Sequence, residues 1–141
     1  MTKISKFYRL SNPPVLCVAS LDVSLQVFAK AGFDNLRSKS LLLTGYLEYL
    51  IDNTVPSGHI KIITPRDPNQ RGCQLSLLFS HNDAVESVSA ALSKGGLIAD
   101  IRKPNVMRIA PVPLYNSFTD VWKFVELLRN VLNDYDNKIN L

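Results

Sequence analysis

The chain has 141 residues, of which 46% are hydrophobic and 20% are charged, and this balance predicts one globular domain of a soluble protein. The formal net charge of +4 is too small to indicate nucleic-acid binding, and no apolar run is long enough to predict a membrane span. The start shows no signal-peptide pattern, and Cys17 and Cys73 lie in apolar runs that predict small buried thiols. We therefore expect a cytoplasmic protein that binds no nucleic acid, membrane or metal.

Residues 1–14 are predicted to form a basic lead-in to a domain that occupies residues 15–141. Three basic residues near the start are interleaved with two aromatic residues, a pattern that can bind RNA but more often marks a solvated segment. The lead-in ends in Asn12-Pro13-Pro14. Because proline restricts the residue before it, Asn12 is expected on stiff, extended backbone.

Two helices are predicted next. Ser20 is the predicted N-cap of the first helix, whose apolar residues recur at helical spacing until Gly32 ends it. The second helix is predicted from Asp34 to Asp52, with leucine and isoleucine residues along the face that would enter the core.

Alternating apolar and polar residues then predict four short strands. These strands are expected over residues 59–64, 73–80, 97–102 and 106–110. A helix over 80–94 separates the two strand pairs, and an amphipathic helix over 118–133 follows the last strand. The predicted fold class is therefore α+β: a small antiparallel sheet of about four strands, in the order β-β-α-β-β, with helices over one face.

Arg108 is the one charged residue in the last predicted strand, which two prolines end at Pro111 and Pro113. Ser117 then opens the final helix, with Asp120 as its capping partner. A guanidinium is costly to bury unless an anion meets it, and its planar fork suits a carboxylate. The pattern therefore indicates an arginine placed to bind an anion.

A structural role for Arg108 stays open, because an acid of the same sheet, such as Asp100 across the hairpin, could pair with it. The chain has no catalytic or nucleotide-binding motif, and we predict no catalytic residue within it. Its two histidines are single and far apart, so structural roles are expected for them. Arg71-Gly72 is interpreted as a turn and not as part of a site.

Five segments, in order along the chain, resemble the kynureninase family. They are RLSNPP (9–14), LLLTGYLEYL (41–50), IITP (62–65), RGCQLS (71–76) and MRIAPVPLYNSF (107–118). The last one also resembles, more loosely, the C-terminal region of other class V aminotransferase-fold enzymes such as cysteine desulfurases. In a desulfurase the nucleophile would be a cysteine, but Cys73 lies in a strand pattern, a poor place for a reactive thiolate.

The resemblance implies a pyridoxal 5'-phosphate enzyme, a homodimer whose subunits have a large cofactor domain and a small C-terminal domain. The family hydrolyses L-kynurenine or 3-hydroxykynurenine to an anthranilate and L-alanine, within tryptophan catabolism and NAD biosynthesis. By this resemblance, Arg108 matches the arginine that binds the substrate's α-carboxylate, and Asn12 matches an asparagine at the cofactor site.

The family's Schiff-base lysine and its other cofactor-binding groups lie upstream of the matched region. The resemblance therefore implies a C-terminal portion without its large cofactor domain, inactive alone and exposing an apolar surface where that domain would dock. The alternative is a free-standing α+β module that binds a small carboxylate or a protein partner.

Overall fold

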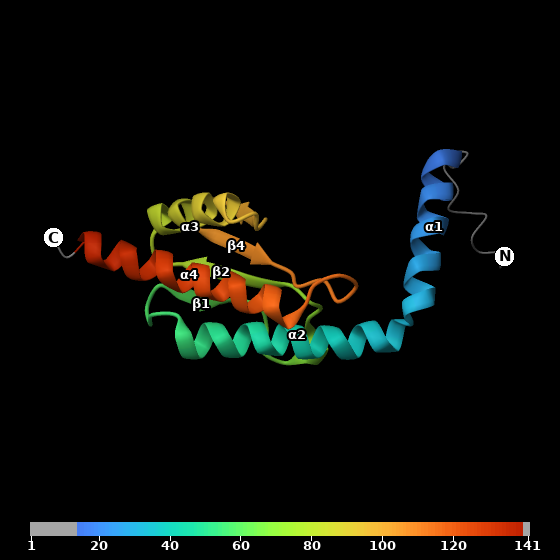
Figure 1. Cartoon of the computed structure of the whole chain (residues 1–141), viewed down its shortest axis with the longest axis horizontal. Helices are drawn as coiled ribbons and strands as arrows, with labels where there is room; N and C mark the ends of the chain where they lie inside the picture. Colours follow the sequence, from blue (N-terminus) through green and yellow to red (C-terminus); the bar gives the residue numbers. More distant parts are fainter. Residues whose placement is uncertain (1–13, 140–141) are drawn as a thin grey trace. The chain divides into compact units, whose positions relative to one another are not determined.

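The computed structural model describes residues 14–139, which divide after Phe33 into two compact units (Figure 1). The elements are α1 (Val15–Ala31), α2 (Phe33–Thr54), β1 (Ile60–Ile62), the 3-10 helix η2 (Pro68–Gln70), β2 (Leu75–Phe79), α3 (Asn82–Lys94), β3 (Asp100–Arg102), β4 (Val106–Ile109) and α4 (Phe118–Ile139). This is the predicted order of helices and strands.

Helix α1 makes up the described part of the first unit, and it begins earlier than predicted. Pro14 precedes the helix in extended geometry, and its carbonyl accepts a hydrogen bond from the N–H of Val18 at 3.1 Å. Ser20 is therefore inside α1, where its Oγ donates to the carbonyl of Leu16 at 2.9 Å, and its predicted role as N-cap is wrong. Gly32 ends the helix with a φ of 83°, as predicted.

Helix α1 buries none of its residues, although its sequence is strongly apolar. Seven of its large apolar residues are between 49% and 83% exposed, and Phe28 is half-buried; the seven are Val15, Leu16, Val18, Leu21, Val23, Leu25 and Val27. Cys17 is also exposed, so the prediction that it is a buried thiol is wrong. Among the described residues, no single helix is long and apolar enough to cross a membrane; α1 and α2 reach that composition only when counted together.

The second unit contains a four-stranded sheet with the order β1-β2-β4-β3, in which every neighbouring pair is antiparallel. Strands β1 and β2 form one hairpin, and β3 and β4 form the other. Helix α3 connects the two hairpins, so that β2 and β4 lie side by side in the middle of the sheet. The predicted α+β fold class is confirmed.

One face of the sheet forms the core of this unit. Leu75, Leu77 and Phe79 of β2 and Met107 of β4 are fully buried, and residues from α2, α3 and α4 complete the same cluster. Burying each such side chain contributes about 1.5–3 kcal/mol relative to leaving it in water. Because side chains alternate along a strand, the residues between these buried ones point to the opposite face.

Helix α4 continues six residues past its predicted end at residue 133. Tyr135 packs against the core, and Asp136 Oδ2 lies 3.0 Å from Nε2 of His59, just before β1. These contacts hold a polar stretch that was expected to fray, and they give His59 a structural role.

Candidate functional site

Arg108 lies on β4, on the face of the sheet opposite the core. Its neighbour Met107 is fully buried, and alternation turns Arg108 away from it. In the register of the sheet, Arg108 stands between Ser76 of β2 and Asp100 of β3. Its side chain is 35% exposed, so a ligand in solvent can reach the guanidinium.

Asp100 pairs with Arg108, as one of the two interpretations of the sequence allowed. Arg108 Nε donates to Asp100 Oδ2 at 2.5 Å, and Arg108 Nη2 donates to the same oxygen. Arg102 Nε donates to it as well, at 3.1 Å. The hydrogen bond from Arg108, together with the nearby charges of Arg102 and Arg108, lowers the pKa of Asp100. The Asp100 side chain is 48% exposed, so this pair stays open to solvent.

The pairing with Asp100 leaves some N–H donors of the Arg108 guanidinium available for a further hydrogen bond. A guanidinium carries five N–H donors, and both bonds to Asp100 use the edge formed by Nε and Nη2. Within residues 14–139, Nη1 of Arg108 makes no hydrogen bond. The edge formed by Nη1 and Nη2 can therefore still receive a carboxylate.

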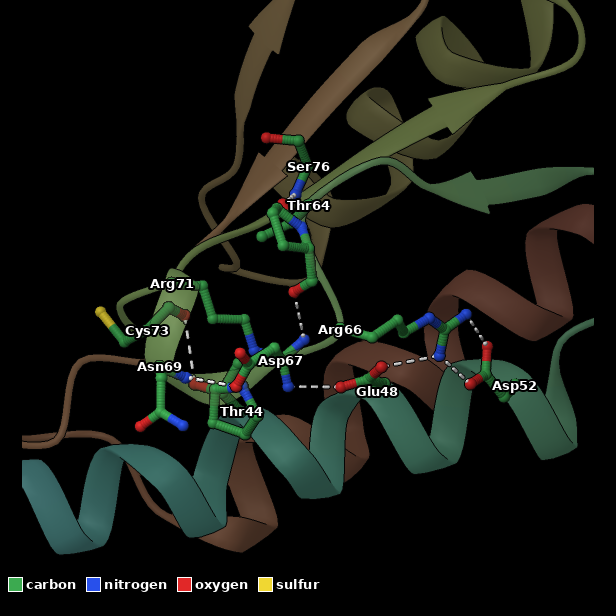
Figure 2. Close-up of polar contacts among 12 residues, drawn as sticks. Thr44, Glu48, Asp52, Thr64, Arg66, Asp67, Asn69, Arg71, Cys73 and Ser76 are labelled. Atoms are coloured by element: carbon green, nitrogen blue, oxygen red, sulfur yellow. Dashed lines mark hydrogen bonds and ion pairs between the residues drawn. The ribbon is translucent and has the colours of Figure 1, made fainter.

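A second group of charged residues joins α2 to the loop between β1 and β2 (Figure 2). Glu48 accepts hydrogen bonds from Arg66 Nη1, at 2.7 Å, and from Arg71 Nη2. Asp52 pairs with Arg66 on its other side. The Arg71 side chain is only 5% exposed and that of Glu48 15%, so the interpretation of Arg71 as a simple turn residue is wrong.

The arginines determine the protonation of Glu48. Burial alone would raise the pKa of its carboxyl, but the hydrogen bonds from Arg71 and Arg66 and their charges outweigh burial and lower that pKa. Asp52 and Glu48 in turn raise the pKa of Arg66. These contacts link Glu48 and Asp52 of α2 to Arg66 and Arg71 of the loop, and we call these four residues the ionic clamp.

Further hydrogen bonds fix the same loop along its length. Arg37 Nη2 donates to the carbonyl of Pro68 at 2.5 Å, and Thr44 Oγ1 donates to that of Cys73 at 3.3 Å. The N–H of Ser76 donates to Thr64 Oγ1 at 2.8 Å. Because Ser76 is the cross-strand neighbour of Arg108, the clamped loop ends beside the Arg108 strand.

The segment after β4 forms the predicted helix start. Ser117 N–H donates to Asp120 Oδ2 at 2.8 Å, and the N–H of Asp120 donates to Ser117 Oγ at 3.3 Å, which confirms the capping box. The backbone bond from Ser117, followed by its hydroxyl, lowers the pKa of Asp120. Beside this segment lies a pocket of about 520 Å³, which Arg108 does not line. Its lining includes Leu47, Ile109, Pro111, Tyr115 and Phe124.

Neither of the strands that pair with β4 contains a lysine that could hold pyridoxal phosphate as a Schiff base. Across the sheet, the neighbours of Arg108 are a serine and an aspartate, and neither is an amine that could form a Schiff base. Asn12, the other predicted site residue, lies outside the described residues. Within residues 14–139 no group of three or more His, Cys, Asp or Glu side chains could hold a metal ion.

Comparison with known proteins places the chain in a family. The model of the kynureninase C-terminal domain matches residues 36–128. Kynureninase from Mus musculus is 51% identical over 133 residues, which cover 89% of this chain and 28% of that protein. The Homo sapiens enzyme is 46% identical over 93% of this chain and 29% of its own length. The chain therefore spans little more than a quarter of these curated relatives.

A solved structure titled "Transaminase with L-ala" shares the fold, with a TM-score of 0.51 over 76% of this chain and 25% of that one. At 17% identity this likeness shows the fold alone. The family model, in contrast, covers more than half of the chain. The chain belongs to the kynureninase family and corresponds to its C-terminal domain.

Proposed function

We propose that this chain is the substrate-binding C-terminal portion of a kynureninase, which hydrolyses L-kynurenine or 3-hydroxykynurenine to anthranilate or 3-hydroxyanthranilate and L-alanine. The observation that carries the proposal is the solvent-accessible Arg108, whose Nη1 is unused within the described residues. The names of the relatives support the reaction class. We expect the intact enzyme to act in the cytoplasm as a homodimer.

Arg108 would bind the α-carboxylate of the amino-acid substrate through parallel charge-assisted hydrogen bonds. Pyridoxal phosphate, when bound, supplies an electron sink for the bond cleavage. Asn12 would contribute to the cofactor side of the site. The residues that hold the cofactor covalently in the family lie outside the matched portion, so we expect the 141-residue chain to be inactive by itself.

The exposed apolar side chains of α1 support an incomplete assembly. A helix that is apolar all round is typical of a buried position, yet α1 buries nothing here. We infer that the remainder of a kynureninase covers this helix. The chain alone should then self-associate and bind a hydrophobic dye, whereas a clean monomer in sedimentation without dye binding would contradict this inference.

The reaction is tested in a chimera that carries this chain in place of the C-terminal 28% of Mus musculus kynureninase. Kynurenine cleavage should be measurable, and Arg108→Ala should lower kcat/KM about 100-fold, mainly through KM, because charged hydrogen bonds to the carboxylate are lost. Lys61→Ala is the matched control, since Lys61 is an exposed cation of β1 in the same sheet. A folded chimera without turnover, or one indifferent to Arg108→Ala, would contradict the proposal.

A carboxylate-binding module is the second candidate, and the accessibility of Arg108 in the chain alone favours it. L-alanine titrated into the 141-residue chain should then shift the NMR signals of residues around Arg108 in a saturable way. Loss of this shift in Arg108→Ala would support free-standing binding, and a silent titration would exclude small-carboxylate binding by the chain alone.

A further inference from the structure

We propose that Asp100 is a positioning residue: it holds the guanidinium of Arg108 along one edge and thereby aims the other edge at the substrate carboxylate. The inference rests on the proposed function and extends it. The observation behind it is that a single oxygen of Asp100, Oδ2, accepts hydrogen bonds from both Nε and Nη2 of Arg108.

The sheet places the two residues for this contact. Asp100 and Arg108 are direct cross-strand partners, and β3 is the edge strand of the sheet. Directly opposed residues of an antiparallel pair have neighbouring Cβ atoms, so the short Asp100 side chain reaches the inner part of the guanidinium and leaves its tip uncovered. Asp100 thus binds Arg108 from the side rather than end-on.

Arg102 keeps this arrangement attractive to an anion. Asp100 by itself would neutralise Arg108 and repel a carboxylate. Arg102 Nε donates to the same Oδ2 at 3.1 Å, so the group of two arginines and one aspartate keeps one net positive charge. Both the orientation of the fork and the sign of the local charge therefore favour a carboxylate at the Nη1 edge.

Positioning lowers the entropic cost of binding. Arginine has a long side chain with many rotamers, and ordering it only when the ligand arrives weakens binding. Two hydrogen bonds to Asp100 order the side chain beforehand. The opposing hypothesis is that Asp100 competes with the substrate for Arg108, and the two hypotheses predict opposite signs when Asp100 is removed.

The test measures KM and kcat for L-kynurenine in the chimera with Asp100→Asn and Asp100→Ala. If Asp100 positions Arg108, KM should rise about threefold in Asp100→Asn, which keeps one acceptor oxygen, and about tenfold in Asp100→Ala, with little change in kcat. If Asp100 competes with the substrate for Arg108, KM should be highest in wild type, lower in Asp100→Asn and lowest in Asp100→Ala. Glu86→Ala, which removes an exposed acid of α3, is the control for charge alone.

Two results would overturn the positioning role: a KM that falls in Asp100→Ala, or a KM that is unchanged while Arg108→Ala still impairs the enzyme. Failure of the proposed function looks different, because wild-type turnover or its dependence on Arg108 would then be absent. In that case the positioning role can still be tested by NMR in the 141-residue chain, through the exchange rate of the Arg108 Nε–H with water. An exchange rate equal in wild type and Asp100→Ala would show that Asp100 does not hold the guanidinium.

Discussion

Two arginine–carboxylate groups in the same unit have similar chemistry and different surroundings. Arg71 is 5% exposed and pairs with Glu48, which is 15% exposed, whereas Arg108 is 35% exposed and pairs with Asp100, which is 48% exposed. Arg71 also donates through Nη1 to the carbonyl of Pro65 at 3.2 Å, and its own carbonyl accepts from Arg37. The difference shows that burial and unused donors, rather than the pairing itself, distinguish an arginine that holds a loop from one available to a ligand.

The largest expected difference between the two groups is in the free energy of unfolding. Arg71→Met leaves the partly buried Glu48 with one partner fewer, and we expect a loss of about 3 kcal/mol, the lower end of the cost of breaking a buried ion pair. Arg108→Met should cost much less, because its pair is exposed to solvent. Urea denaturation of both variants measures the contrast. Equal losses would show that exposure does not separate the two roles.

The pH dependence of stability should follow the buried group. The pKa of Glu48 is lowered in the folded chain from an ordinary value of 4.5, so its contribution is complete above pH 4.5 and is lost as the pH falls through the lower folded pKa. Glu48→Gln should be less stable than wild type at pH 7, and the gap should narrow with acid. Urea midpoints at pH 7 and below pH 4.5 measure this gap, and a gap that widens in acid would contradict the assignment.

Sequence separation explains why one group could be predicted and the other could not. Asp100 and Arg108 are eight residues apart on a hairpin, so the alternation of the strands already suggests that they face each other. Glu48 and Arg71 are 23 residues apart, on a helix and a loop. A charged loop is typically solvated, and no local pattern indicates which helix position it will contact.

The distinction between local and distant contacts also applies to the prediction of the helices and strands. The two hairpins and the capping box at Ser117 follow from local alternation and spacing and were predicted, whereas the pairing of β2 with β4 in the middle of the sheet was not. The end of α4 could not be predicted, because the contact between His59 and Asp136 joins residues that are 77 positions apart in the sequence. An exposed apolar surface was expected from the family resemblance, but no local pattern indicated that it would include α1.

The smallest expected loss of folding free energy concerns the hydrogen bond from Thr44 of α2 to the loop between β1 and β2. Thr44 is 2% exposed, and its hydroxyl donates to the carbonyl of Cys73. Thr44→Val keeps the shape of the side chain and removes that donor, so the loss should be about 1 kcal/mol in urea denaturation, below that of Arg71→Met. Thr119→Val, at an exposed position of α4, is the control. If Thr44→Val cost as much as Arg71→Met, the loop would be held by its backbone contacts to α2, and the ionic clamp would be secondary.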